Sequence, residues 1–365
     1  MNIVFRADAS TQIGTGHVMR CLTLADFLSM NGAKCQFICK KLDGNIISII
    51  EKKGYQVFPI KPDIKSFNSK KKPELYESWL SSSQHSDASS SIEYVKGLKP
   101  QWIVVDSYSL DRSWEKLLRP YCSNMLVIDD LANRLHDCDL LLDQTVLRSF
   151  DNYKNKVNDG CYILCGSEYS LLRPEFKNWR LKSKNKMFSD LPFKILLNLG
   201  GVDQNDDTSK IIDALVNCQL PKDTEITIVM GPQAPFLKKV LKKSQLLPCT
   251  SFVYSGVSNM AELMSGSHIC IGAAGSTSWE RCCVGLPSII VVIADNQRAI
   301  AKNLEACGAA VAIDIENVIV ELDVAIKKLL DNWSAYREAC FKVVDGSGCS
   351  RVMHAMKQVA NGALK

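Results

Sequence analysis

A single histidine lies in a glycine-rich loop near the start of the chain, and its type and position suit proton transfer. The segment Gly14-Thr15-Gly16-His17-Val18-Met19-Arg20 follows an apolar run that ends at Asp8. The two glycines permit a tight turn and a close approach of the backbone to a ligand. His17 falls in the first turn of a predicted helix, where the positive helix end leaves the ring neutral and able to accept a proton. We interpret His17 as a general base, rather than as a capping or merely exposed histidine.

The neighbours of His17 are polar residues that can assist it. Arg20 lies one helical turn further along, on the same face. Asp8 and Arg20 either orient the base or the substrate, or form an ordinary ion pair. A dinucleotide-binding loop is the main alternative for two nearby glycines, but Met19 occupies the position of its third glycine. No nicotinamide or flavin cofactor is therefore expected.

A second segment has the residue types of a phosphate site. The predicted strand His268–Gly272 runs into Ala273-Ala274-Gly275-Ser276-Thr277-Ser278-Trp279-Glu280, which opens a helix. Gly275, Ser276 and Thr277 leave the first backbone N–H groups of this helix available to phosphate oxygens. Glu280 lies one turn deeper on the face of Ser276, where a carboxylate can accept hydrogen bonds from both ribose hydroxyls. Helix capping by Ser276 or Thr277 is the simpler alternative.

Other loops that follow predicted strands complete this second site. Gly200 and Gly201 end the first strand of the second half, and Asn296 lies in the polar loop Ala294-Asp295-Asn296-Gln297. Val257 precedes a helix from about Asn259, a position where backbone atoms can read the edge of a base. Several loops that meet at the same ends of parallel strands are stronger evidence than any one of them.

Alternating apolar runs and helical patterns predict parallel sheets built from βαβ units, and hence an α/β fold. A chain of 365 residues fits two such doubly wound domains, expected to face each other across a cleft. The polar stretch 182–191 marks the seam. The predicted domains are residues 1–184, with the base and the sugar site, and 185–347, with the nucleotide site. A final helix over 348–365 is expected to pack back on the first domain. The predicted strands are Ile3–Asp8, Cys35–Lys40, Trp102–Asp106, Leu126–Asp129, Leu140–Asp143, Lys194–Leu199, Glu225–Met230, Phe252–Tyr254, His268–Gly272, Ser288–Ile293 and Ala310–Ile313.

Composition narrows the class of protein. A net charge of +5 with 23% charged residues suits a small anionic ligand and lacks the dense basic face of a nucleic-acid binder. The 15 cysteines are odd in number and none forms a C-x-x-C pair, which favours free thiols in a reducing compartment. No signal segment or membrane span is evident, so we expect a cytoplasmic protein without stable membrane association, and nothing requires more than a monomer.

Two segments have weaker interpretations. Residues 66–91 carry a lysine run and two serine runs, and are interpreted as a solvated linker or mobile loop. Trp79 within that segment suggests that part of it packs or covers the cleft. His136-Asp137-Cys138-Asp139 contains an Asp-x-Asp, which holds a cation in some sugar-transferring enzymes. Because this segment precedes a strand, away from the expected cleft, no metal is predicted.

At this level of detail the chain resembles the UDP-sugar hydrolase of pseudaminic acid biosynthesis, a family with the glycosyltransferase-B fold that is related to the murein N-acetylglucosaminyltransferase. The resemblance runs almost from end to end. It rests on the segments Arg6-Ala7-Asp8-Ala9-Ser10, Gly14-Thr15-Gly16-His17-Val18-Met19-Arg20-Cys21, Asp106-Ser107-Tyr108, Val127-Ile128-Asp129-Asp130-Leu131-Ala132, Leu140-Leu141-Leu142-Asp143-Gln144, Leu171-Leu172-Arg173-Pro174-Glu175-Phe176, Asn198-Leu199-Gly200-Gly201, Gly272 to Cys283 and Ala294-Asp295-Asn296-Gln297.

The resemblance implies hydrolysis of UDP-2,4-diacetamido-2,4,6-trideoxy-β-L-altropyranose to the free sugar and UDP. It makes His17 the base, Tyr108 and Asn296 substrate-contacting residues, and Glu280 the ribose ligand. The chemistry is consistent, because UDP leaves as a stabilised anion and needs no strong acid, so a base for water and an anion cradle suffice. Direct displacement with inversion is then expected, with domain closure that excludes water. The alternatives are a UDP-sugar glycosyltransferase, a UDP-sugar 2-epimerase of the same fold, and a non-catalytic UDP-sugar sensor.

Overall fold

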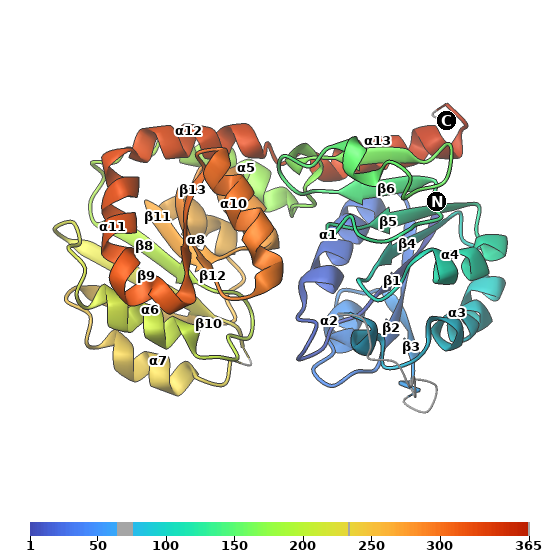
Figure 1. The fold of residues 1–365 in the computed structure, drawn as a ribbon, viewed down its shortest axis with the longest axis horizontal. Helices are drawn as coiled ribbons and strands as arrows, with labels where there is room; N and C mark the ends of the chain where they lie inside the picture. Colours follow the sequence, from blue (N-terminus) through green and yellow to red (C-terminus); the bar gives the residue numbers. More distant parts are fainter. Residues whose placement is uncertain (64–75, 233, 364–365) are drawn as a thin grey trace. The chain divides into compact units, whose positions relative to one another are not determined.

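The computed structural model describes residues 1–63, 76–232 and 234–363. The chain divides into two compact units, each with its own sheet (Figure 1). Unit 1 comprises Met1–Leu171 and Ser347–Lys365, and unit 2 comprises Leu172–Gly346. The division thus falls earlier than the seam expected within 182–191. The reason is helix α5 (Pro174–Ser183), which contacts α8 (Met260–Gly266) and α9 (Ser276–Cys283) of unit 2.

Unit 1 is built on a seven-stranded parallel sheet with the order β3-β2-β1-β4-β5-β6-β7. The five strands predicted for this half are present within one or two residues of their expected bounds. Two further strands, β3 and β7, lie at the two edges, where short or proline-containing strands carry little sequence signal. The strands are β1 (Asn2–Ala7), β2 (Lys34–Lys40), β3 (Gln56–Ile60), β4 (Trp102–Asp106), β5 (Asn124–Ile128), β6 (Leu140–Asp143) and β7 (Tyr162–Cys165).

Helices cover both faces of the unit 1 sheet. Apolar residues of α1 (Gly16–Met30) and α13 (Gly348–Ala360) share one core with β1, β2 and β4. Apolar residues of α3 (Gln84–Leu98) and α4 (Arg112–Leu118) form the other core. The short helix α2 (Ile47–Lys52) contributes to the first core. The C-terminal helix therefore helps to cover one face of the sheet that the N-terminal part of the chain forms.

Unit 2 repeats the arrangement with a six-stranded parallel sheet of order β10-β9-β8-β11-β12-β13. Its strands are β8 (Phe193–Asn198), β9 (Thr224–Met230), β10 (Thr250–Ser255), β11 (Ile269–Ala273), β12 (Ser288–Val292) and β13 (Ala310–Asp314). Helices α6 (Asp207–Leu215), α7 (Leu237–Ser244) and α11 (Val318–Asp331) share one core. The remaining helices besides α5, α8 and α9 are α10 (Arg298–Ala306) and α12 (Trp333–Val343). The predicted α/β fold with two doubly wound sheets is confirmed.

Each sheet has one point where the strand order reverses. In unit 1 it lies between β1 and β4, and in unit 2 between β8 and β11. Loops that follow such neighbouring strands diverge and leave a crevice at the carboxyl ends, which is where ligands bind in open α/β sheets. The histidine loop follows β1, and the predicted phosphate segment follows β11, so both lie at a reversal point.

The interpretation of residues 66–91 as a linker is wrong for its second half. Residues 84–91 belong to helix α3, whose N-cap Ser83 accepts a hydrogen bond from the Ser86 amide at 3.1 Å. A short 3-10 helix, η2 (Glu77–Leu80), precedes it. Serines suit the cap and the exposed face of a helix as well as a linker, and composition alone does not separate the two. The lysine run at 70–72 lies outside the described residues.

Two further expectations concern cysteines and membranes. All fifteen cysteines are free thiols, as expected. Among the described residues, no helix has both the length and the apolar character needed to cross a bilayer.

Candidate functional site

The loop after β1 is a compact turn that leads directly into helix α1. Ser10 closes it, because its carbonyl accepts from the Gly14 amide at 2.9 Å and its hydroxyl from the Ile13 amide at 2.9 Å. Gly14 has a φ of +77°, a conformation that favours glycine. Gly16 begins α1, and a side chain added there would meet open space. The turn therefore delivers His17 to the first turn of the helix, at the carboxyl ends of the strands.

His17 is held by a carboxylate from the neighbouring strand. Its Nδ1 lies 2.6 Å from Oδ1 of Asp106, the last residue of β4. Burial alone would raise the pKa of Asp106, but the charge of Arg20 and the nearby His17 hold it well below its usual range. The carboxylate is therefore ionised and accepts the Nδ1 proton, which leaves Nε2 as the basic nitrogen of the ring. His17 is 8% exposed, so its orientation is fixed by packing as well.

Arg20 binds the same carboxylate and a second one. Its Nε donates to Asp106 Oδ2 at 2.6 Å and its Nη2 to Asp106 Oδ1 at 2.7 Å. Its Nη1 donates to Asp130 Oδ2 at 2.8 Å. Burial would lower the pKa of Arg20, but Asp106 and Asp130 outweigh it and raise that pKa. Arg20 thus lies on the face of His17, as predicted, and fixes the acceptor of the His17 proton.

Tyr108 closes this ring of contacts. Its hydroxyl donates to Asp130 Oδ1 at 3.0 Å, and its ring meets the His17 ring edge-on with centroids 4.6 Å apart. Burial, followed by the charge of Asp130, raises the pKa of Tyr108 well above its usual value, so the phenol remains a neutral donor. The cluster of His17, Arg20, Asp106, Tyr108 and Asp130, called the histidine cluster below, draws on α1, the end of β4 and the loops after β4 and β5.

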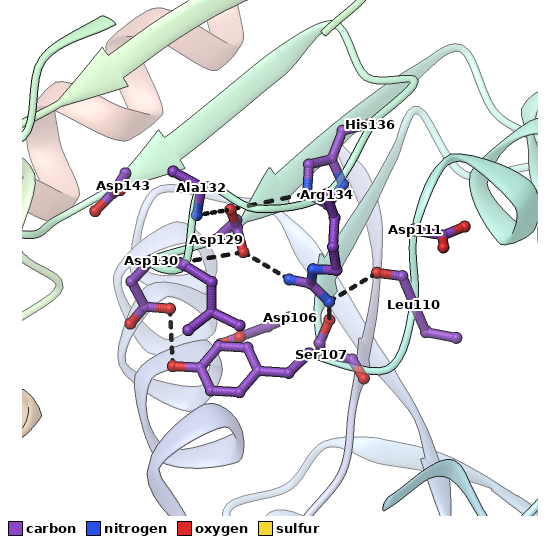
Figure 2. A network of polar contacts seen from close by, with 12 residues as sticks. Asp106, Ser107, Leu110, Asp111, Asp129, Asp130, Ala132, Arg134, His136 and Asp143 are labelled. Atoms are coloured by element: carbon purple, nitrogen blue, oxygen red, sulfur yellow. Dashed lines mark hydrogen bonds and ion pairs between the residues drawn. The ribbon is translucent and has the colours of Figure 1, made fainter. Parts of the chain in front are cut away.

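Arg134 fastens these two loops together. Its Nη1 donates to the carbonyl oxygens of Ser107 at 3.0 Å and Leu110 at 3.1 Å, and its Nη2 donates to Asp129 at 2.6 Å (Figure 2). Asp129 also accepts from the Ala132 amide at 2.9 Å. The loop that carries Tyr108 is therefore tied to the loop that carries Asp130, which keeps the histidine cluster in one arrangement.

Asp8 is engaged elsewhere. It accepts from Arg6 Nη1 at 2.6 Å and from the Lys40 amide at 2.7 Å, and it is 4% exposed. Arg6 in turn pairs with buried Asp87 of α3. Of the two roles considered for Asp8, the structure has the ion pair, which joins the ends of β1 and β2 to α3.

The predicted phosphate segment of unit 2 has the expected strand–loop–helix form. Gly275 is the N-cap of α9, and Ser276 and Thr277 are its first two residues. The first N–H groups of a helix have no partner within it, and the positive helix end attracts anions. Capping by Ser276 or Thr277 is not what the structure has, because the hydroxyl at the cap belongs to Ser278, which accepts from the Gly275 amide at 3.3 Å.

A buried cation lies beneath this helix end. Arg281 is 1% exposed, and its Nη2 donates to the Ala273 carbonyl at 2.8 Å and to Ser278 Oγ at 2.9 Å. Its Nε and Nη1 have no hydrogen-bond partner among the described residues. A side chain on Gly272 would collide with the guanidinium, so glycine is required there to admit it. The positive charge therefore adds to the field of the helix end, where an anion would bind.

Glu280, the predicted ribose ligand, is partly buried in the same helix. Its Oε1 lies 3.5 Å from Arg173 Nη2, and Arg173 also pairs with Glu175 at 2.8 Å. Burial raises the pKa of Glu280, and Arg173 opposes that rise. With only this long contact among the described side chains, the carboxylate retains acceptor capacity for hydroxyl groups.

The other predicted residues of unit 2 lie on loops at the carboxyl ends of its strands. Gly200, at a φ of +113°, and Gly201 follow β8, and the Gly201 carbonyl lies close against Gly231. Val257 follows β10 and is partly buried, and Asn296 is exposed in a 3-10 turn after β12. Gly200, Gly201, Gly275, Ser276, Thr277 and Glu280 follow the two strands that flank the reversal point, whereas Val257 and Asn296 follow strands further out.

His136, Asp137 and Asp139 have structural partners. Arg119 pairs with Asp137 at 2.8 Å and with Asp139 at 2.5 Å, and His136 Nδ1 lies 2.7 Å from Glu115. In the part of the chain that the structure describes, no group of three or more His, Cys, Asp and Glu residues is arranged to hold a metal ion.

Sequence reasoning missed two residues of the histidine cluster. Asp106 and Asp130 were recognised only as parts of longer matching segments. Asp106 is the last residue of β4 and Asp130 lies two residues after β5, positions similar to that of Asp8 after β1, and the strand order places them beside α1. A strand-end carboxylate on the neighbour of β1 is therefore the feature that indicates the partner of His17.

Comparisons with known proteins agree with the fold. Residues 196–342 match the glycosyltransferase family 28 C-terminal domain. The crystal structure of MurG from Acinetobacter baumannii superposes with a TM-score of 0.68 at 16% identity, over 98% of this chain and 99% of that one. The chain has the glycosyltransferase-B fold.

Similar proteins were also found from sequence. The chain is 27% identical to the UDP-2,4-diacetamido-2,4,6-trideoxy-β-L-altropyranose hydrolase of Campylobacter jejuni, over 76% of this chain and 86% of that protein. This agrees with the resemblance found in the sequence. It is also 25% identical to an uncharacterized protein of Methanocaldococcus jannaschii, over 82% of this chain but only 57% of that protein.

Proposed function

We propose that this chain hydrolyses a UDP-activated sugar, with UDP-2,4-diacetamido-2,4,6-trideoxy-β-L-altropyranose as the substrate. The observation that carries the proposal is the 2.6 Å contact between His17 Nδ1 and the ionised Asp106, which leaves the other ring nitrogen free to act as a base. The relative from Campylobacter jejuni supports the choice of substrate. The match of residues 196–342 to a glycosyltransferase domain supports binding of the nucleotide by unit 2.

The proposed reaction is a single displacement. His17 Nε2 takes a proton from water while the water oxygen forms a bond to the anomeric carbon. The bond between that carbon and the diphosphate oxygen breaks, and its electron pair leaves with UDP. The configuration inverts because water enters opposite the leaving group. Arg20 and Asp106 hold the imidazole in one tautomer, as a carboxylate does for other catalytic histidines.

Unit 2 supplies the electrostatic part of the proposal. The N-terminal amides of α9 and the charge of Arg281 stabilise the growing negative charge on the diphosphate. The Glu280 carboxylate accepts hydrogen bonds from the ribose hydroxyls. A diphosphate that is stabilised in this way leaves without a protonating acid, which fits a site with one base rather than two carboxyl groups.

The test is UDP release with water as the only acceptor. The wild-type chain, His17→Ala and the control His354→Ala, an exposed histidine on α13, are compared with chelator present. We expect rapid release by wild type and control, and a fall in kcat of about 10²- to 10⁴-fold for His17→Ala with UDP binding retained. Unchanged release by His17→Ala would contradict the assignment of the base.

A glycosyltransferase is the second candidate, favoured by the match to the family 28 domain. A transferase would release UDP only when an acceptor is added, and a non-catalytic sensor would bind UDP-sugar without releasing UDP. Absence of release from the wild-type chain in water therefore rejects the hydrolase in favour of one of these two.

A further inference from the structure

Three aromatic rings form a continuous group beside His17. Tyr76 immediately precedes the 3-10 helix η2, and Trp79 lies within it. The Tyr76 ring lies 5.1 Å from the Tyr108 ring, and the Trp79 ring stacks over Tyr108 at 6.0 Å with an interplanar angle of 28°. Tyr76 and Trp79 contact each other edge-on at 4.7 Å. Since Tyr108 contacts the His17 ring, the aromatic group begins at the proposed base.

The backbone holds this group in place. The Ser109 hydroxyl donates to the Tyr76 carbonyl at 2.6 Å, which joins the start of η2 to the loop after β4. The end of η2 is fixed by buried Lys40, whose Nζ donates to the Leu80 carbonyl at 2.7 Å. Leu80 itself is 2% exposed and belongs to the core beneath α3. The two aromatic side chains are therefore presented from a fixed turn.

Their exposure indicates a surface for a ligand rather than a part of the core. Tyr76 and Trp79 both remain partly exposed, whereas Trp102 and Trp114 of the same unit are at most 1% exposed. Aromatic faces offer large apolar area with little conformational freedom to lose. Such faces suit the C–H surface and methyl groups of a sugar, and suit a deoxy, N-acetylated sugar better than one rich in hydroxyls.

We propose that Tyr76 and Trp79 form the apolar wall of the sugar subsite and select sugars with methyl-rich, deoxygenated faces. This rests on the proposed function, because the reacting carbon of the sugar must lie at His17. Arg20, Asp106, Tyr108 and Asp130 form hydrogen bonds with one another, so the wall supplies the apolar contact that these residues do not offer. The two residues bind the substrate and take no part in proton transfer.

The test measures binding without turnover. Calorimetry gives the Kd of the free 2,4-diacetamido-2,4,6-trideoxy sugar and, separately, of UDP, for wild type, Trp79→Ala and Trp79→Phe. Trp179→Ala is the matched control, because Trp179 is also partly exposed but lies in unit 2 beside Lys182. We expect Trp79→Ala to weaken sugar binding about tenfold, Trp79→Phe to retain most of it, and UDP binding to be unchanged in all variants.

The outcomes separate the two proposals. Equal sugar affinity for Trp79→Ala and wild type, or a parallel loss of UDP affinity, would contradict the proposal that Trp79 forms part of an apolar wall. A wild-type chain that does not bind the free sugar overturns it as well. A wild-type chain that binds the sugar, with the loss in Trp79→Ala, but releases no UDP contradicts the hydrolase and leaves the wall standing.

Discussion

His136 in unit 1 and His268 in unit 2 are each about 1% exposed, yet their pKa values move in opposite directions. Burial alone would lower the pKa of His136, but Asp129 and Glu115 outweigh it and raise that pKa to about 9. Burial, together with the charge of Lys186, lowers the pKa of His268 to about 4. His268 Nδ1 accepts from the Lys194 amide at 2.9 Å, as a neutral ring can.

Several arginines of the two units also differ in their partners, although Arg173 and Arg298 of unit 2 pair with carboxylates. In unit 1, Arg20 and Arg134 meet carboxylates. In unit 2, Arg180, Arg281 and Arg337 donate to backbone carbonyls. Paired charges in unit 1 fix loops and side-chain orientation, because buried partners tolerate little displacement. Arg281 meets a carbonyl and a hydroxyl oxygen, neither of which carries a net charge, so its positive potential remains available to an anion.

Asp106→Asn tests whether the paired charges of unit 1 fix the orientation of His17, and it has the largest expected effect. An amide at position 106 no longer requires the Nδ1 proton, so the His17 ring loses its fixed tautomer, and Arg20 loses one of its two carboxylates. We expect kcat for UDP release to fall about 1,000-fold, with the Kd for UDP unchanged. Single-turnover kinetics and UDP calorimetry measure the two quantities.

Asp130→Asn is the matched control for that change. It removes the other carboxylate of Arg20 but leaves the contact between His17 and Asp106 intact. We expect less than a tenfold fall in kcat. Equal losses in the two variants would mean that Arg20, rather than the partner of His17, controls the rate.

The pKa values of the two buried histidines are shifted in opposite directions, which predicts opposite pH dependences of stability. The folded pKa of His136 lies above its unfolded value of 6.5, so its stabilisation is complete below about pH 6.5 and disappears as pH rises through about 9. The difference between the folded and unfolded pKa values of His136 corresponds to about 3 kcal/mol in the free energy of unfolding. His268 prefers the neutral form, so its stabilisation exists above about pH 6.5 and disappears as pH falls through about 4.

Urea unfolding of wild type and His136→Gln across this range measures the effect. The wild-type free energy of unfolding should decrease from pH 6.5 to 9 by the amount due to His136, and His136→Gln should lack that decrease. His354→Gln, at an exposed position of α13, serves as the control. A variant with the same alkaline slope as wild type would show that Glu115 and Asp129 do not hold a protonated histidine.

Sequence alone predicted most of the fold because the central strands are continuous apolar runs bounded by polar residues. Trp102–Asp106 and Leu140–Asp143 have the expected bounds. The edge strands β3 and β7 were not predicted, since Gln56–Ile60 contains a proline and Tyr162–Cys165 is short. Edge strands pair on one side only and need less apolar character.

The candidate sites were predicted where local sequence decides the geometry. The glycines around His17 and the residues at the start of α9 are local signals, and the structure places them at reversal points of the sheets. The partners of His17 depend on strand order, which brings Asp106 beside α1 although it lies 89 positions after His17 in the sequence. Arg281 was likewise invisible, because an arginine inside a helix gives no indication of which groups surround it.

Arg281→Met tests whether the buried charge of Arg281 in unit 2 contributes to anion binding. The substitution keeps an apolar stem of similar length and removes the charge beneath the α9 N-terminus. We expect the Kd for UDP to rise about tenfold while the Kd for uridine, which carries no phosphate, is unchanged. Calorimetry with both ligands measures this.

Two further variants distinguish the effect of the Arg281 charge from an effect on packing. Arg281→Lys retains the charge and should lose less affinity for UDP than Arg281→Met. Gly272→Ala should weaken UDP binding even though it alters no charged group, because its new side chain displaces the guanidinium. Equal losses for UDP and uridine would indicate that Arg281 only supports the packing of α9. A loss confined to UDP would establish that unit 2 uses a buried charge for its ligand, whereas unit 1 uses buried charges to hold its own side chains.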